Sequence, residues 1–200
     1  MTRETAMIML IRNPAYTDTV IAEIKKRFAA ERSVQLQSLL SAESYESLTK
    51  IILTQETKEW RVPDEAWFQR ITGKKALLPE LIQLLQQITG RKIKTQEWRL
   101  FLPHHYTLRK DHDENEKKKD EKQNQQMKKG KIFALLDLAS LDESWGGYTS
   151  VVGDAGEVIR IIPQANTLSI ITIAHDQDHF VKYVNCTAAS PRVLWIAELG

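Results

Sequence analysis

Residues 179–200 read HFVKYVNCTAASPRVLWIAELG. Their two halves, 179–187 and 192–200, are short runs rich in β-branched and aromatic residues, and a Ser-Pro pair separates them. This pattern is typical of two strands joined by a turn. Four similar runs precede them, at residues 94–108, 131–139, 156–164 and 166–174. Short strands in close succession predict an all-β sandwich or jelly-roll barrel for the second half of the chain.

The first half of the chain has a helical rather than a strand-like period. Residues 17–31, 41–55 and 78–90 place apolar side chains three and four positions apart, which predicts three amphipathic helices. Threonines at the start of the first, Ser41 at the start of the second and Gly90 at the end of the third suit helix ends.

Length and composition are those of a soluble globular domain. The chain has 200 residues, 42% of them hydrophobic and 27% charged, which is enough to bury a core within one domain. We therefore expect a single α+β domain over 1–200, in which a mainly helical part (1–92) packs against a β-rich core (93–200). The formal charge of +2 is too small to indicate a dedicated nucleic-acid binder.

The sequence also indicates a reducing compartment. No apolar run approaches the ~20 residues that a membrane span needs, and the apolar run at the N-terminus is short and lacks a small-residue cleavage pattern. Cys186 is the single cysteine, so an intramolecular disulfide is excluded, and its apolar surroundings predict a buried thiol. These features predict a cytoplasmic protein without a membrane partner.

A polar segment rich in Lys, Glu and Gln at residues 115–130 separates two of the expected strands. Its composition is typical of a solvated loop or a marginal helix, and a lid that contacts the substrate is the alternative. Its lysines are interleaved with acidic residues and lack aromatic neighbours, unlike a surface on which nucleic-acid bases stack. A nucleic-acid partner bound through this loop is thus disfavoured, although the loop leaves that alternative open.

All five histidines lie in the β-rich half, at positions 104, 105, 112, 175 and 179. Adjacent residues of a strand point to opposite faces, so His104 and His105 do not share a metal. His175 and His179 in HDQDH have the spacing of a helical zinc site. The strand-like segments on both sides favour a turn instead.

His112 and Glu114 form a second candidate site together with His179. In an extended segment, residues two apart point the same way, so His112 and Glu114 can face one metal ion while Asp113 faces away. With His179 they would complete the arrangement of two histidines and one carboxylate that binds Fe(II) by one face. As a spacing pattern H-x-E is common by chance, so the alternative is a solvated charge run.

Arg192 begins the last expected strand, 13 residues after His179. A hairpin would bring its guanidinium back toward the metal. There it could bind the carboxylate of a diacid co-substrate through two parallel hydrogen bonds. The alternative is a surface arginine at the start of a strand.

Five stretches in this order resemble motifs of the 2-oxoglutarate/Fe(II)-dependent dioxygenases, in particular the prolyl-hydroxylase branch that includes the ribosomal-protein prolyl hydroxylases. The resemblance covers roughly residues 78–200. It is carried by LIQLLQQITGRKI (81–93), DHDEN (111–115), LDESWGGYTSVV (141–152), IPQANTLSIITI (162–173) and HFVKYVNCTAASPRVLWIAELG (179–200).

The resemblance implies a double-stranded β-helix core of the jelly-roll or cupin-like kind, with the N-terminal helices packed against it. It implies that His112, Glu114 and His179 bind Fe(II) and that Arg192 binds 2-oxoglutarate, with O₂ as the second co-substrate. The tyrosine that commonly assists this co-substrate is replaced by Pro103, and Tyr106 is the substitute we expect. The implied function is a hydroxylase acting on an unactivated C–H bond, with a prolyl residue of a protein or peptide as the substrate.

Two departures leave other functions open. Glu114 stands where the family has Asp, and the extra methylene moves the carboxylate by about an ångström or more. The family's glycine-containing turn before the first ligand is also missing. The alternatives are a catalytically silent β-helix that binds a protein or RNA partner, and an oxygenase of small molecules.

Overall fold

The computed structural model describes residues 12–63, 65–72, 79–108 and 130–200. Its helices are α1 (Asp18–Glu31), α2 (Ala42–Leu53) and α3 (Pro79–Thr89). The expected helices are therefore confirmed to within two residues at each end. Thr17 and Ser41 cap α1 and α2 by accepting hydrogen bonds from the backbone N–H groups of Val20 and Ser44, as expected for N-cap hydroxyls.

Eleven strands form one antiparallel sheet in the described part of the chain, with the order β1-β9-β6-β11-β4-β3-β5-β10-β7-β8 and with β2 paired to β3 alone. The strands before the long charged segment are β1 (Ser33–Leu36), β2 (Thr57–Val62), β3 (Ala66–Ile71), β4 (Ile93–Phe101) and β5 (Tyr106–Thr107). Those after it are β6 (Lys131–Asp137), β7 (Thr149–Gly153), β8 (Gly156–Ile161), β9 (Thr167–Ile173), β10 (Asp178–Val181) and β11 (Arg192–Leu199).

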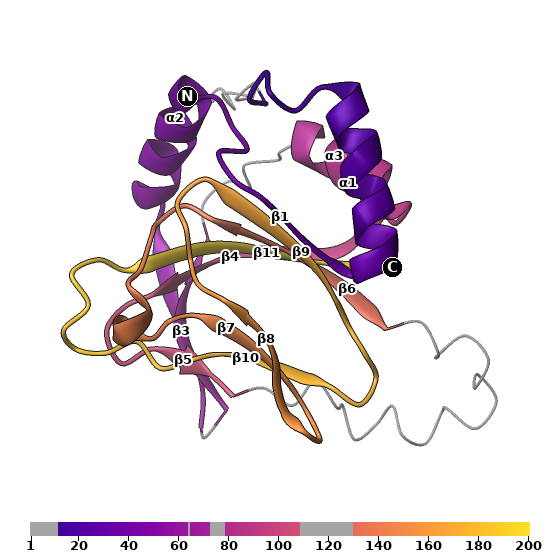
Figure 1. Ribbon diagram of the computed structural model, residues 1–200. Helices are drawn as coiled ribbons and strands as arrows, with labels where there is room; N and C mark the ends of the chain where they lie inside the picture. The colour runs from indigo at the N-terminus through magenta and orange to yellow at the C-terminus, as the bar shows by residue number, and fades with distance from the viewer. Residues whose placement is uncertain (1–11, 64, 73–78, 109–129) are drawn as a thin grey trace.

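The sheet curls into two layers, with β1, β9, β6, β11 and β4 above and β3, β5, β10, β7 and β8 below in the view of Figure 1. Strand β11 shows how the residues divide between its faces. Trp195 belongs to the apolar cluster that includes the helices, whereas Leu194 and Ile196 belong to the cluster inside the curl. This alternation follows from the two-residue period of a strand. Side chains from both layers thus meet in one interior.

The three helices lie on the outer face of the upper layer, with α1 beside α3 and α2 apart from them (Figure 1). They cover that layer with residues such as Phe28, Leu48 and Leu85, each no more than 5% exposed. The other face of the same strands is left to line the interior. The α+β class and the jelly-roll type of core are therefore confirmed.

Three strands lie in the region expected to be mainly helical. The segment EWRVPDEAWF (59–68), between the second and third expected helices, contributes to a β2–β3 hairpin in which Trp60 pairs with Phe68 across the strands. The hairpin extends the lower layer beside β4 and β5. Cys186 is exposed, so the expectation of a buried thiol was wrong.

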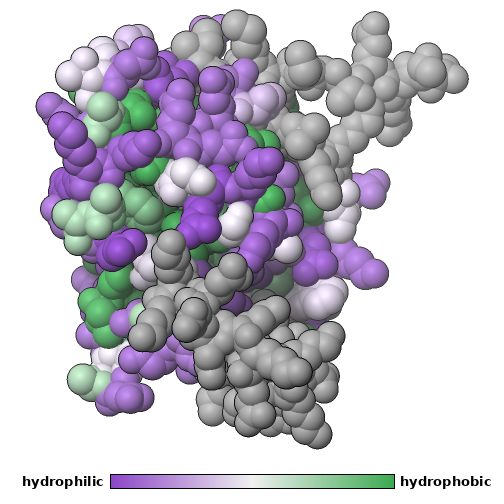
Figure 2. Space-filling view, turned by 90° about the vertical axis from the view of Figure 1, so that its right-hand side faces the viewer, coloured by the Kyte–Doolittle hydropathy of each residue, from purple (hydrophilic) through white to green (hydrophobic). Residues whose placement is uncertain are grey.

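The described surface is predominantly hydrophilic on the face shown in Figure 2, with hydrophobic side chains in small separate areas. None of the helices that the structure describes is long and apolar enough to cross a membrane.

Candidate functional site

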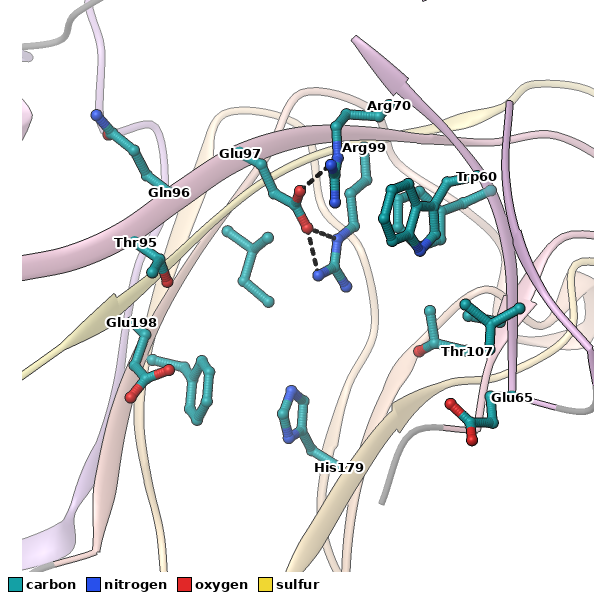
Figure 3. A pocket seen from close by; sticks show the side chains of 15 residues that line it. Trp60, Glu65, Arg70, Thr95, Gln96, Glu97, Arg99, Thr107, His179 and Glu198 are labelled. Carbon is teal, nitrogen blue, oxygen red and sulfur yellow. Dashed lines mark hydrogen bonds and ion pairs between the residues drawn. The ribbon is translucent and has the colours of Figure 1, made fainter. Parts of the chain in front are cut away.

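A pocket of about 380 Å³ opens into the interior of the curled sheet (Figure 3). Strands of both layers line it, together with the loop residue Glu65. It combines charged groups, a histidine and an apolar floor, as binding sites commonly do. Its lining consists of Trp60, Val62, Glu65, Ala66, Phe68, Arg70, Thr95, Gln96, Glu97, Arg99, Thr107, Phe133, His179, Ile196 and Glu198.

His179 is the histidine of this pocket, and its side chain points into the space in Figure 3. It lies on β10 opposite Val151 of β7, so strand pairing fixes its backbone. Its ring lies 4.6 Å from that of Phe133, centroid to centroid, which restricts how the imidazole can rotate. The predicted metal ligand is thus held at the wall of a cavity large enough for a small molecule.

Glu97 is ion-paired to two arginines on the opposite wall (Figure 3). Its carboxylate is 2.7 Å from Nε of Arg70, and it accepts a hydrogen bond of 2.6 Å from Nε of Arg99. The guanidinium groups of Arg70 and Arg99 also lie over the rings of Trp60 and Phe68, respectively. These contacts hold two cations and one anion in fixed positions at the pocket wall.

Arg192 lies deeper in the same interior and is completely buried. Its Nε and one Nη donate hydrogen bonds of 2.6 and 2.9 Å to the two carboxylate oxygens of Asp137 on the neighbouring strand β6. The other Nη donates to Gly147 O at 2.9 Å and to Thr149 Oγ1 at 2.8 Å. Arg192 is therefore an inward-facing residue, as the sequence predicted, but its guanidinium already holds a carboxylate.

Asp137 was missed by the sequence analysis. Burial raises the pKa of its carboxyl group above the usual range, and the adjacent charge and hydrogen bonds of Arg192 act in the opposite direction. Its signal in the sequence is a single acidic residue inside the apolar run KIFALLDLA. A buried carboxylate needs a cationic or hydrogen-bonding partner, and an inward-facing arginine was already available at position 192.

The register of the strands relates the buried ion pair to His179. Val181 lies opposite Thr149, and His179 lies opposite Val151. Thr149, whose Oγ1 accepts a hydrogen bond from Arg192, is therefore two residues from Val151, which pairs with His179. Two residues of a strand span ~7 Å. The Arg192 guanidinium and the His179 imidazole thus occupy successive inward-facing levels of the same interior.

His112 and Glu114 lie outside the described residues. The last described segment before them ends with β5, where Thr107 lines the pocket and its Oγ1 accepts from the N–H of Val181, two residues after His179. Within the described ranges, no three His, Cys, Asp or Glu side chains are grouped so that they could hold a metal ion. His179 has the donor chemistry of an iron ligand.

Among the described residues, His104, His105, His175 and Tyr106 are not part of the pocket lining. His105 is 4% exposed, accepts a hydrogen bond from the N–H of Leu102 at its Nδ1, and packs against Trp67. Burial lowers the pKa of His105. The segment HDQDH begins with a turn at His175 and continues into β10, so the preference for a turn over a helical zinc site is confirmed. Tyr106 precedes Thr107 on β5, and it is Thr107 that faces the pocket.

The described contacts leave no open bidentate site on Arg192 for 2-oxoglutarate. The predicted acid-binding group, Arg192, has its Nε edge occupied by both oxygens of Asp137. A second carboxylate can take this edge only by displacing the first, because bidentate binding uses both donors. The role of Arg192 toward the co-substrate therefore stays a prediction, and the described contacts stand against it.

No family model matches the sequence, and no curated protein matches it. Solved structures do match. A prolyl-4-hydroxylase from Pseudomonas putida superimposes with a TM-score of 0.62 at 16% identity, over 90% of this chain and 97% of that one. A 2OG-Fe(II) oxygenase family oxidoreductase from Burkholderia pseudomallei gives 0.62 at 10% identity, over 92% of each chain.

A prolyl hydroxylase from Trichoplax adhaerens, in complex with a peptide fragment of the hypoxia inducible factor oxygen degradation domain, gives a TM-score of 0.63 at 10% identity. It covers 99% of this chain and 94% of that one. These matches extend over the helices as well as the sheet. The chain has the double-stranded β-helix fold of the 2-oxoglutarate/Fe(II) oxygenases, the superfamily that its motifs resemble.

Proposed function

We propose that the chain is an Fe(II)- and 2-oxoglutarate-dependent oxygenase that hydroxylates an unactivated C–H bond, with a prolyl residue of a protein as the first substrate to test. The observation that carries this proposal is the position of His179, whose imidazole faces a pocket inside a β-helix of the oxygenase type. A surface histidine would not be placed in this way.

In this proposal His112, Glu114 and His179 hold the iron. Iron with 2-oxoglutarate and O₂ supplies the oxidant for hydroxylation of a C–H bond. The described residues contribute the surroundings. Pairing with Val151 and contact with Phe133 hold the His179 ring.

A peptide substrate is supported by the entrance of the pocket. Trp60 on the β2–β3 hairpin lines the pocket and is 41% exposed. The Arg70 guanidinium covers one face of its ring, and the exposed part of the ring can contact a residue that enters. Glu65 adds an exposed carboxylate at the same entrance. The peptide complex of the Trichoplax adhaerens hydroxylase gives a precedent in the same fold. A reducing, cytoplasmic setting is consistent with the single cysteine.

Anaerobic titration with Fe(II) followed by 2-oxoglutarate tests the proposal. We expect a visible charge-transfer absorption when the co-substrate chelates the iron, and we expect succinate to form when O₂ is admitted. Peptides from a digested proteome then provide candidate substrates, identified by a mass increase of one oxygen. Absence of both iron binding and 2-oxoglutarate turnover in the folded protein would reject the proposal.

The ion pair between Asp137 and Arg192 favours one second candidate, a catalytically silent β-helix that binds a protein partner. In that case the interior is structural, and the 115–130 segment is the first docking element to test. Removal of this segment would then abolish partner binding. If the protein is an oxygenase and the segment is only a solvated loop, the same deletion would leave co-substrate turnover unchanged.

A further inference from the structure

Asp137 and Arg192 present a complete carboxylate-binding arrangement inside the β-helix. The exposed fractions of the two side chains are 2% and 0%. Both carboxylate oxygens accept hydrogen bonds from the guanidinium, while Gly147 O and Thr149 Oγ1 accept from its remaining Nη. The arginine is therefore fixed by two acceptors on one side and presents its Nε edge to an acid on the other.

The location of the pair connects it to the pocket. Asp137 follows Phe133 of the pocket lining by four residues on β6, and Arg192 precedes Ile196 of the lining by four residues on β11. All four side chains face the interior, because residues an even number apart share a face. The ion pair therefore faces the same interior as the pocket, four residues further along each strand, and Leu135 and Leu194 occupy the inward positions between them.

Stability alone gives little reason for these two charges. A buried ion pair recovers in mutual attraction roughly what both groups lose in hydration, so that well-packed apolar residues often serve as well. Neighbouring inward positions on both strands, such as Leu135 and Leu194, are apolar. A role in binding an acid would explain why Arg192 is present at this buried position.

We propose that Asp137 is a built-in competitor that fills a carboxylate site at Arg192, so that an external acid binds Arg192 only when the Asp137 carboxylate leaves it. Where that acid is 2-oxoglutarate, the inference rests on the proposed function. Asp137 is then the residue that sets the affinity of the protein for its co-substrate.

Replacement of Asp137 by alanine tests the inference, because it removes one carboxylate and leaves space for a small acid. The thermal stability of the Asp137→Ala protein is measured in sodium formate and in sodium chloride of equal ionic strength. We expect formate to raise its melting temperature in a saturable manner that the unaltered protein does not show. The doubly substituted Asp137→Ala/Arg192→Met protein is the control without the cation, and it should not respond.

Equal responses of the single and double variants would overturn the inference, as would no response to formate. If Asp137→Ala does not fold in chloride, the yield of refolded protein in the two salts becomes the measurement. A higher yield in formate supports the inference, and equal yields overturn it.

Binding of 2-oxoglutarate separates this inference from the proposed function. We expect Asp137→Ala to bind 2-oxoglutarate about tenfold or more tightly than the unaltered protein, measured by calorimetry with Mn(II) in place of iron. If formate stabilises the variant but neither protein binds 2-oxoglutarate, the carboxylate site stands and the proposed function fails. If both proteins bind 2-oxoglutarate equally, the proposed function stands and Asp137 is not a competitor.

Discussion

The guanidinium of Arg192 and the carboxylate of Asp137 join strands β11 and β6 through two hydrogen bonds of 2.6 and 2.9 Å in the interior of the protein. Asp137 pairs with Leu194 across the two strands. Its hydrogen bonds therefore run diagonally to Arg192, which lies two positions before Leu194 and faces the same way. The pair is buried, and the other hydrogen bonds that Arg192 makes to described residues go to the uncharged acceptors Gly147 O and Thr149 Oγ1.

Arg192→Met should lower the free energy of unfolding by about 3–5 kcal/mol at neutral pH, because the charge of Asp137 is left buried and unpaired. Urea denaturation measures this change. Burial raises the pKa of Asp137 and Arg192 opposes the rise, so its folded pKa is higher still in the variant. The folded variant then binds a proton more readily than the unfolded chain, and its deficit should shrink as the pH falls. A deficit that grows toward acid would contradict this account.

His105 should make stability depend on pH. Burial lowers its folded pKa below the ordinary value of 6.5, and Nδ1 accepts from the N–H of Leu102 in the neutral ring. Between the two pKa values the unfolded chain binds more protons, so stability is greatest above pH 6.5 and decreases as the pH falls through the folded pKa. His105→Gln should flatten the dependence of the unfolding free energy between pH 7 and 5 (about the range of His titration). If the unfolding free energy of the variant depends on pH as strongly as that of the unaltered protein, groups other than His105 cause the dependence.

Gly146→Ala should destabilise the protein by about 3 kcal/mol, since its backbone conformation is nearly restricted to glycine. Gly146 has φ +71° and ψ −147°, and an added Cβ would lie 2.0 Å from the carbonyl oxygen of Tyr183. Gly153→Ala is the matched control, because its Cβ would meet nothing closer than 3.6 Å. Thermal unfolding of the two variants gives the comparison, and equal losses would rule out a special role for Gly146.

His179→Ala should remove metal binding while leaving the fold intact. Loss of a metal-ligating side chain should lower the affinity for Fe(II) or Mn(II) by more than about a hundredfold, beyond what loss of a supporting contact costs. His175→Ala is the control, since His175 is an exposed residue at the turn before β10. Metal titration by calorimetry, with circular dichroism to check folding, decides the matter. Equal affinity in both variants would exclude His179 as a ligand.

Substitutions at Asp113 and Glu114 test which of the two carboxylates is the metal ligand. Glu114→Asp should retain or improve metal binding, because the shorter carboxylate is the one usual in the family. Asp113→Ala should leave the affinity nearly unchanged, since alternate residues of an extended segment face opposite ways. If Asp113→Ala abolishes binding and Glu114→Ala does not, the register is shifted by one residue.

The helices and the β-core were predictable because their signals are local. The 3.6-residue and 2-residue periods report which face of an element is buried, and Thr17, Ser41 and Gly90 mark helix ends by their own backbone preferences. The β2–β3 hairpin was missed because β2 is exposed along almost its whole length and therefore has no alternating pattern, and β3 alternates only over its first four residues. Its structure depends on pairing with β4 and β5 rather than on its own pattern.

The sequence by itself determined the helices of the first part and the strand-rich second part, because each depends on spacing within one segment. The β-helix type of the core was an expectation from the resemblance, and the approach of Arg192 to the site was an expectation from a supposed hairpin. The tertiary structure alone decided that His179 faces a pocket, that Glu97 lies between Arg70 and Arg99, and that Asp137 is the partner of Arg192. Those contacts join residues from strands distant in sequence, and Arg192 and Asp137 are separated by 55 positions. Only the order in which the strands pair brings such residues together, and local periodicity carries no information about that order.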